Sequence, residues 1–349
     1  MNKVYTDVDT NWKMINKVVF KTFVISITVL STVFIIGCLY LNYWFFKDAP
    51  KYLLVSTDYE PIKFDLSSVT TSKGFIIQKA SMVIPAEIED IPNKLYFQFD
   101  TGASNTIIYQ NSLNSLKNIG LDFKILQIDG RSFVDELSIK LGGSKISLKL
   151  IEIVEYSGED FTKTDTLNYK SLGSIGTDFI SDYITEIDFK NRNIRFYKER
   201  EDWMTENNKF ESFDFKGRKL MLPCIIENKK QKMYYDSGSS SYGLLTTKGR
   251  FKNYSNKNSK EVNYELLSWG RASWWNGTIQ VYENETDKIM NMTGIEINLN
   301  KVSHVDILGN FQDIVKPFTE INGWLGNIPF LGYSLIFDAP KHEFLIIEK

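Results

Sequence analysis

Two short segments of this sequence carry an aspartate followed by a hydroxyl residue and a glycine. The first is Asp100-Thr101-Gly102 and the second is Asp236-Ser237-Gly238. An apolar, strand-like run precedes each aspartate, so each carboxyl is expected at the end of a buried strand, on the floor of a cleft. The glycine permits a tight turn and the close approach of a substrate backbone. The hydroxyls of Thr101 and Ser237 can bind back to the scaffold and fix the loops.

A pair of such carboxyls has a specific acid–base chemistry. If the two loops meet across a two-fold axis, their like charges lie too close for both to ionise, and the pair holds one proton. One carboxylate then acts as a base toward a bridging water, and the other acts as an acid toward a carbonyl oxygen. Asp100 and Asp236 are therefore predicted to be catalytic, although a single loop of this kind is usually only a turn between strands.

The two aspartate loops belong to an internal repeat. A glycine after an apolar residue follows each loop, at Gly176 and at Gly326, and a hairpin-like segment closes each copy. Asp188 follows Gly176 by 12 residues, and Asp338 follows Gly326 by the same 12 residues. The spacing at the end of each copy is the same, whereas the length of the middle part differs. This is typical of repeats whose loops diverge around a fixed scaffold. The repeat therefore predicts two similar lobes.

The body has the residue patterns of a β protein. Short runs rich in branched and aromatic residues, bounded by Gly, Asn, Asp or Ser, are predicted strands; they include residues 75–77, 95–99, 146–154 and 194–197. Short helices are expected at residues 111–117 and 310–316. The fold class is therefore mostly β, with the N-terminal lobe at residues 61–202 and the C-terminal lobe at residues 203–349.

These segments resemble the active-site motifs of the pepsin and retropepsin group of aspartic peptidases, in the single-chain, two-lobe form. Residues 96–105 are similar to the family's first motif and residues 236–240 to its second, and the likeness covers about residues 70–349. The resemblance implies a bilobal pepsin-like (acid protease) fold of two β-barrel-like lobes. It also implies peptide-bond hydrolysis by an activated water, without a metal or an organic cofactor. Gly102 and Gly238 would contact the substrate backbone.

Two positions depart from the family's pattern. Family members carry a flap hairpin with a tyrosine near its tip, whereas the corresponding residues 127–133 contain none. Asp129 and Gly130 form a favourable hairpin turn there and are predicted to bind substrate, with a plain surface hairpin as the alternative. Ala103 replaces a hydroxyl residue. Because this donor to the carboxylate is missing, the pKa of the pair should rise and the pH optimum should be mild.

A membrane anchor is predicted at residues 22–46. This run has 25 residues and no charge, which is enough to cross a bilayer with some tilt. Aromatic residues gather at its far end, as they do at a membrane interface, and lysines precede it. The chain is therefore expected to be a single-pass membrane protein, with residues 1–21 in the cytoplasm, a connector at residues 47–60 and the peptidase domain on the extracytoplasmic side.

Two other readings of this apolar run compete with the anchor. A cleaved signal peptide is one, but the run is too long for a typical signal sequence. Cleavage before Cys38, as in a bacterial lipoprotein, is the other. The residues after Cys38 remain apolar up to Phe46, which argues against such cleavage.

Composition limits the partners. A net charge of −2 gives no electrostatic reason to expect nucleic acid. Two cysteines and two histidines do not supply a disulfide framework or a clustered metal site, so no metal is predicted. The expected partners are a polypeptide substrate and, through the N-terminal helix, a membrane. The body is expected to act as a monomer.

Other functions compete with an endopeptidase. A catalytically silent peptide-binding module on the same fold is the main alternative. A serine hydrolase would need a histidine beside its nucleophile, and the chain offers only His304 and His342 without a G-x-S-x-G elbow. A glycosidase also uses two carboxylates, but it rarely places them on twin Asp-hydroxyl-Gly loops. The leading hypothesis is a membrane-anchored aspartic endopeptidase.

Overall fold

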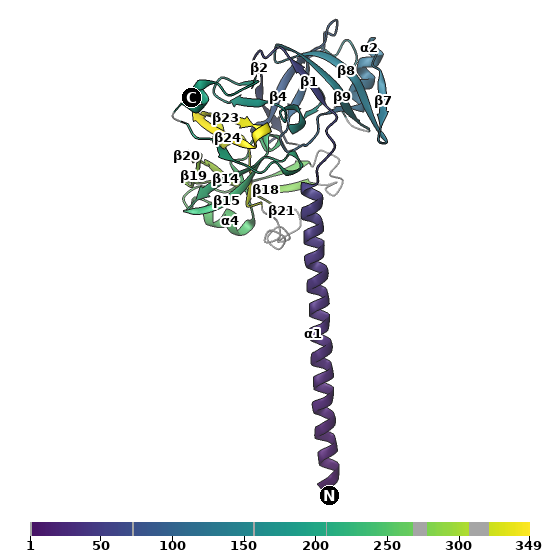
Figure 1. The fold of residues 1–349 in the computed structure, drawn as a ribbon, viewed down its shortest axis with the longest axis vertical. Coiled ribbons are helices and arrows are strands. Elements are labelled where there is room, and N and C mark those ends of the chain that lie inside the picture. The colour runs from purple at the N-terminus through teal and green to yellow at the C-terminus, as the bar shows by residue number, and fades with distance from the viewer. Residues whose placement is uncertain (1, 72, 156–157, 207, 268–277, 307–320) are drawn as a thin grey trace.

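The computed structural model describes residues 2–71, 73–155, 158–206, 208–267, 278–306 and 321–349. One long helix, α1 (Asn2–Phe46), projects from a body built mainly of strands (Figure 1). The predicted mostly β class is confirmed. The helix predicted at residues 310–316 lies outside the described residues.

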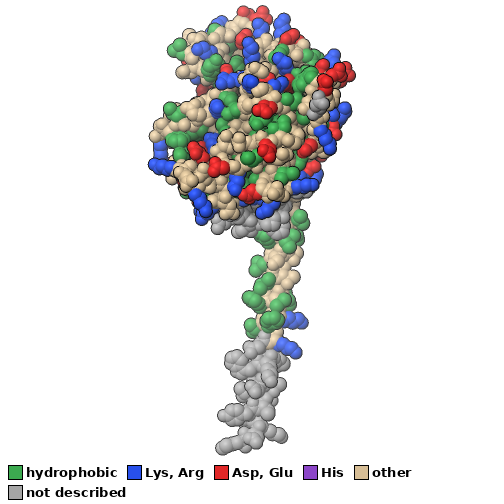
Figure 2. All heavy atoms as spheres, turned by 90° about the vertical axis from the view of Figure 1, so that its left-hand side faces the viewer, with side chains coloured by type: hydrophobic (Ala, Val, Ile, Leu, Met, Phe, Trp, Pro, Cys, Tyr) green, Lys and Arg blue, Asp and Glu red, His purple; other side chains and the backbone are tan. Residues whose placement is uncertain are grey.

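Helix α1 contains a stretch, Lys17–Trp44, that is long and apolar enough to cross a membrane. Large apolar side chains along it, such as Phe23 and Leu30, are exposed rather than packed on the body. Figure 2 shows hydrophobic side chains along this part of the helix and basic side chains at its far end. The helix ends at Phe46, where the predicted anchor ends.

The first half of the body forms one large sheet. In the described part of the chain it has nine strands, in the order β1-β9-β6-β10-β5-β4-β8-β7, with β3 paired to β4. The strands are β1 (Leu54–Thr57), β3 (Asp65–Thr70), β4 (Ile76–Glu87), β5 (Leu95–Phe99), β6 (Ile107–Tyr109), β7 (Ile125–Ile128), β8 (Arg131–Leu141), β9 (Ser144–Val154) and β10 (Lys170–Ile175). Helix α2 (Gln110–Ile119) follows β6 and confirms the helix predicted at residues 111–117.

The second half forms a sheet of similar plan. Its nine described strands run in the order β17-β18-β21-β16-β22-β15-β14-β19-β20. They are β14 (Met221–Ile226), β15 (Lys229–Tyr235), β16 (Leu244–Leu245), β17 (Val262–Leu267), β18 (Thr278–Glu285), β19 (Ile289–Met292), β20 (Ile295–Asn298), β21 (Lys301–Asp306) and β22 (Gly323–Leu325). Helix α4 (Lys248–Tyr254) follows β16, as α2 follows β6.

The internal repeat is visible in how these strands pair. In the first sheet β10 is parallel to β5 and antiparallel to β6. In the second sheet β22 is parallel to β15 and antiparallel to β16. The aspartate-bearing strands β5 and β15 therefore occupy corresponding positions.

A third sheet joins the two halves. Its six described strands are β2 (Ile62–Lys63), β11 (Ile184–Asp188), β12 (Asn193–Tyr197), β13 (Glu211–Ser212), β23 (Tyr333–Asp338) and β24 (Glu343–Glu348). Strand β11 of the first copy pairs antiparallel with β23 of the second. The hairpins predicted at the ends of the copies are thus hydrogen-bonded to each other, and β23 and β24 lie between the larger sheets in Figure 1. A short helix, α3 (Asp202–Thr205), lies before β13 in the polar stretch between the copies.

One hydrophobic core runs through both halves. Alternate residues of β5 point into it, and Phe97 and Phe99 are fully buried. Tyr235 of β15 stacks on Phe337 of β23 with ring centroids 5.9 Å apart. Burying an aromatic side chain of this size stabilises the fold by roughly 1.5–3 kcal/mol. The ends of β5 and β15 are therefore rigidly placed.

The predicted connector, residues 47–60, is not irregular throughout. Strand β1 lies within it and pairs antiparallel with β9, with Leu54 opposite Lys149. The physical reason is that the edge of a sheet offers unpaired N–H and C=O groups to any extended segment beside it. The connector therefore begins to pack on the body soon after α1 ends. The predicted limits of the two lobes stay predictions.

Candidate active site

Strands β5 and β15 bring the two predicted catalytic aspartates to corresponding positions. Asp100 directly follows β5, and its N–H donates to the Ile175 carbonyl at 2.9 Å. Asp236 directly follows β15, and its N–H donates to the Leu325 carbonyl at 2.9 Å. Each aspartate is thus fixed by the strand that runs parallel to its own.

A glycine packs behind each aspartate loop. A Cβ on Gly176 would lie 2.6 Å from the carbonyl carbon of Asn105, and a Cβ on Gly326 would collide with the carbonyl oxygens of Ser239 and Tyr242. Only glycine permits this approach. The short 3₁₀ helices η1 (Thr177–Phe179) and η6 (Ile328–Phe330) follow these glycines. The repeated glycines found in the sequence therefore support the two loops from behind.

The hydroxyls of Thr101 and Ser237 bind the opposite loop, not their own. Thr101 Oγ1 donates to the Tyr235 carbonyl at 3.1 Å and accepts from the Ser237 N–H at 2.8 Å. Ser237 Oγ donates to the Phe99 carbonyl at 2.9 Å and accepts from the Thr101 N–H at 2.9 Å. Both side chains are almost fully buried. The sequence predicted that these hydroxyls fix the loops, and the four hydrogen bonds show that they fix them to each other.

The two carboxyls converge on one place. A Cβ on Gly102 would lie 2.6 Å from Asp236 Oδ1 and 2.8 Å from Asp100 Oδ1, and a Cβ on Gly238 would collide with the Asp100 carboxyl. The two carboxyls are close enough for the charge of Asp236 to raise the pKa of Asp100. The Gly102 N–H donates to Asp100 Oδ1 at 2.8 Å, and the Gly238 N–H donates to Asp236 Oδ1 at 2.9 Å. All six predicted residues of the twin loops therefore meet in one site.

The two carboxyls differ in the donors that they receive. Ser239 Oγ donates to Asp236 Oδ2 at 2.8 Å, and its N–H lies 3.2 Å from Asp236 Oδ1. The corresponding residue of the first loop is Ala103, which offers Asp100 only a backbone N–H. Donors favour the ionised form of the carboxylate that receives them. The shared proton is therefore expected on Asp100.

The pKa of Asp100 is raised to about 7. The main cause is burial of the carboxyl, and the second is the adjacent charge of Asp236. The N–H groups of Gly102 and Ala103 lower it only in part. The sequence predicted a raised pKa for the pair because Ala103 lacks a hydroxyl. The larger cause is that the loops hold the carboxyl where water reaches it poorly, since desolvation disfavours the charged form.

Two residues beside the carboxyls were not predicted. The Tyr234 hydroxyl donates to the Gly102 carbonyl at 2.8 Å. Lys219 Nζ lies 3.4 Å from Ser104 Oγ and 5.9 Å from the centre of the Tyr234 ring. Burial lowers the pKa of Lys219, and the charges of Asp236 and Asp100 act in the opposite direction. No local motif marks either residue, because both reach the first loop from the second half of the chain.

The predicted hairpin turn at Asp129 and Gly130 is present between β7 and β8, with both residues at positive φ. The Tyr52 hydroxyl donates to Asp129 Oδ2 at 2.6 Å, and the Tyr52 ring packs 4.8 Å from that of Phe133. A tyrosine thus reaches the hairpin tip from the connector. The structure gives Asp129 a partner within the protein, and substrate binding by Asp129 and Gly130 stays a prediction.

No protein-family model and no curated protein matches this chain. Within the described residues, no three His, Cys, Asp or Glu side chains are grouped so that they could hold a metal ion. The geometry of the two loops is therefore the basis for inferring a function.

Proposed function

We propose that this chain is a membrane-anchored aspartic endopeptidase of pepsin-like, bilobal fold, in which Asp100 and Asp236 activate one water molecule. The observation that carries the proposal is the convergence of the two carboxyls between Gly102 and Gly238. The charge of Asp236 raises the pKa of Asp100, which supports a shared proton, because two such close carboxyls cannot both ionise.

The proposed reaction assigns one role to each carboxyl. Asp236, which receives the hydroxyl of Ser239, is the ionised member and takes a proton from the bridging water. Asp100, whose pKa is raised to about 7, holds the other proton and donates it to the carbonyl oxygen of the scissile bond. Collapse of the resulting tetrahedral diol passes a proton to the leaving nitrogen and restores the pair.

The central strands of the two large sheets follow a corresponding order, β9-β6-β10-β5-β4 in the first and β21-β16-β22-β15-β14 in the second, which supports a bilobal fold. In this arrangement the N-terminal and C-terminal lobes would each supply one aspartate to the floor of a shared cleft. A polypeptide substrate would bind there as an extended strand, recognised through its backbone. The absence of a side chain at Gly102 and Gly238 would leave room for that backbone.

The apolar helix supports a membrane location. Its exposed apolar side chains need an apolar surrounding, and a lipid bilayer provides one. Lysines before the apolar run favour a cytoplasmic N-terminus. We therefore place the peptidase body on the extracytoplasmic side, so that its substrates would be polypeptides outside the cytoplasm.

A cleavage assay with a trapping agent tests the proposal. Full-length protein in detergent is incubated with an unfolded protein, with hydroxylamine present, and new termini are identified by mass spectrometry. Direct attack by water predicts new carboxylic acids only, and a statine-type inhibitor should prevent their formation. Hydroxamate products would indicate a covalent acyl intermediate and contradict the mechanism. Binding of the inhibitor without any cleavage would instead support a silent peptide-binding module.

A further inference from the structure

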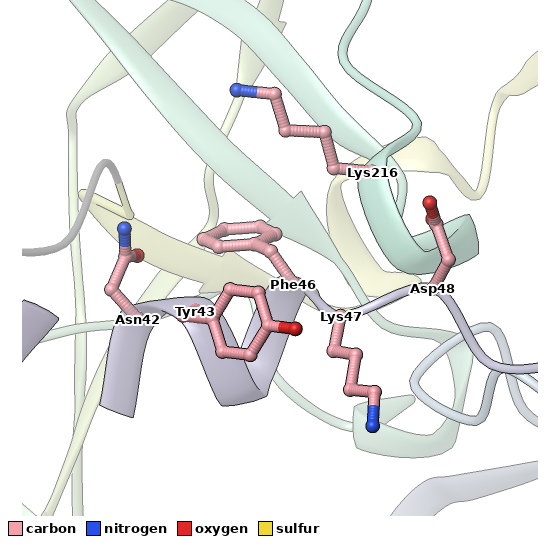
Figure 3. A pocket seen from close by; sticks show the side chains of 6 residues that line it. All are labelled: Asn42, Tyr43, Phe46, Lys47, Asp48 and Lys216. Carbon is pink, nitrogen blue, oxygen red and sulfur yellow. The ribbon is translucent and has the colours of Figure 1, made fainter. Parts of the chain in front are cut away.

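The segment that follows α1 lies against the back of the Asp100 loop, with η2 (Lys216–Arg218) between them. The Gly217 N–H donates to Asp48 Oδ1 at 3.1 Å, and the Gly217 carbonyl accepts from Ser104 Oγ at 2.7 Å. One glycine therefore connects a residue just after the helix with a residue four positions after Asp100. Figure 3 shows the end of α1 and Asp48 beside Lys216 of η2.

Arg218 binds both sides of this junction through one side chain. Its Nε donates to the Ser104 carbonyl at 2.9 Å, and its Nη2 donates to Asn105 Oδ1. Its Nη1 donates to the Ala49 carbonyl at 2.7 Å, and Nη2 also lies 3.5 Å from the Pro50 carbonyl. The guanidinium is a planar fork of five donors, so a single rigid group fixes the loop relative to the connector.

The backbone of Arg218 is left-handed, with φ of 56°. For a residue other than glycine this conformation costs roughly 1–2 kcal/mol. Such a cost persists only where the surroundings compensate for it. Here the hydrogen bonds of the guanidinium to the loop and the connector supply the compensation, which indicates that this junction is a constrained feature of the fold.

The contacts extend from the junction to the β7–β8 hairpin. Asn105 Nδ2 donates to Glu152 Oε2 at 3.3 Å, and Arg131 Nη1 pairs with the same oxygen at 3.3 Å. On the other side, the Tyr52 hydroxyl of the connector binds Asp129 at the hairpin tip. The connector thus contacts both the support of the Asp100 loop and the predicted flap.

An anion site at the same junction is a weaker reading. A hollow of about 400 Å³ lies there, lined by Asn42, Tyr43, Phe46, Lys47, Asp48 and Lys216. Figure 3 shows the amino groups of Lys47 and Lys216 pointing in opposite directions. Cations that do not converge cannot bind one anion together, and the Asp48 carboxylate between them would repel it.

We propose that Arg218 is a positioning residue for Asp100. It joins the connector at residues 48–50 to Ser104 and Asn105, so that the placement of the Asp100 carboxyl depends on the docked connector. The inference rests on the proposed function, because a positioning role has meaning only where the two carboxyls act on a substrate. The coupling between the connector and the Asp100 loop can be measured without any substrate.

Hydrogen exchange of the full-length protein in detergent tests this coupling. Arg218→Lys keeps the positive charge but loses the planar fork. We expect the backbone amides of residues 101–106 to exchange at least about ten-fold faster than in the wild type. In the variant the loop can open without breaking the hydrogen bonds of the guanidinium, so opening costs less free energy. The matched control is Arg192→Lys, whose side chain pairs with Asp65 at an exposed site. The control should leave exchange in the loop unchanged.

Kinetics supply the second readout. For Arg218→Lys we expect kcat to fall by about 10- to 100-fold with KM within about two-fold, because a displaced catalytic group slows the chemical step. Asp48→Ala, which removes the acceptor for Gly217, should change exchange in the same direction by a smaller factor.

Two results would overturn the inference. One is unchanged exchange at residues 101–106 in Arg218→Lys. The other is an equal increase in exchange in the loop and in β11 and β24, since this would show a general loss of stability. If the wild type cleaves no polypeptide, the proposed function fails, whereas the exchange result still decides whether connector and loop are coupled.

Discussion

Thr101 and Ser237 exchange hydrogen bonds across the two halves of the chain. Each hydroxyl accepts from the N–H of the other residue, at 2.8 Å and 2.9 Å. Each also donates to the carbonyl of the residue that precedes the other aspartate. Because both side chains are almost fully buried, water cannot replace these bonds. The two loops therefore behave as one unit, and their separation should cost much of the stability of the fold.

Replacing Thr101 by valine tests this unit. Valine has a similar shape but no hydroxyl, so the Ser237 N–H and the Tyr235 carbonyl lose a buried partner. Each unsatisfied group costs about 1–3 kcal/mol, and we expect the free energy of unfolding to fall by about 2–4 kcal/mol. Urea denaturation measures this loss. Thr101→Ser retains the hydroxyl and should lose about 1 kcal/mol; equal losses in both variants would contradict a role for the hydroxyl.

A methyl group at Gly102 should block the site without unfolding the protein. Its Cβ would lie 2.6 Å from Asp236 Oδ1, so Gly102→Ala must displace a carboxyl that the proposed reaction needs. We expect activity to fall by about 100-fold, as small displacements of reacting groups can cost this much. The control is Gly249→Ala in α4, where nothing lies within 4 Å of the added Cβ. Gly249→Ala should retain activity and gain up to about 1 kcal/mol of stability.

The raised pKa of Asp100 predicts a pH-dependent cost to stability. The pKa is about 7 in the folded protein and about 3.9 in an unfolded chain. Between these values the folded state binds more protons than the unfolded state, so stability falls as pH rises from about 4 to about 7. Asp100→Asn removes this cost. Because the proton is shared with Asp236, only part of this cost belongs to Asp100 alone, and we expect a gain of about 1–2 kcal/mol at pH 8.

Thermal denaturation at pH 4.5 and at pH 8 checks the sign of this effect. Asp100→Asn should raise the Tm at pH 8 and change it much less at pH 4.5. A stabilisation that is larger at pH 4.5 than at pH 8 would show that the pKa of Asp100 is lowered, not raised.

Enzyme activity should change over the same pH range in which Asp100 loses its proton. In the proposed mechanism Asp100 must hold its proton to act as the acid, so kcat/KM should fall as pH rises through about 7. The observed value belongs to the coupled pair, not to one residue. Measuring kcat/KM from pH 3 to pH 9 tests this prediction. Maximal activity below about pH 3, with little left at pH 6, would disagree with the environment of Asp100.

The apolar helix predicts stable association with membranes. The full-length protein should remain in the membrane fraction after alkaline carbonate extraction. A lysine at the centre of a spanning helix costs about 2.5–3.5 kcal/mol, so Leu30→Lys should release a substantial part of the protein. Leu167 is an exposed residue of the body, and Leu167→Lys should release none. Complete extraction of the wild type would exclude an integral anchor.

Local patterns in the sequence predict much of this site. The apolar strands before Asp100 and Asp236, the glycines behind the loops and the turn at Asp129 follow from residue type and short spacing. These features depend on backbone geometry that a few neighbouring residues determine.

The remaining features depend on contacts between distant segments. Arg218 reaches Ser104 across 114 residues of chain, and no spacing rule marks such a pair. The exchange of hydrogen bonds between Thr101 and Ser237 requires the two halves to be docked first. For the same reason β1 was expected as connector, since an edge strand is defined by the sheet beside it rather than by its own residues.

Turnover by the two single asparagine variants tests the central claim most directly. Asn keeps the size of each side chain but can neither act as a base nor share a proton. We predict that Asp100→Asn and Asp236→Asn each reduce kcat for a peptide substrate by about 10²- to 10⁴-fold, while Asp135→Asn, at an exposed ion pair with Lys124, keeps the wild-type rate. Near-wild-type turnover in either Asp100→Asn or Asp236→Asn would contradict a shared catalytic pair.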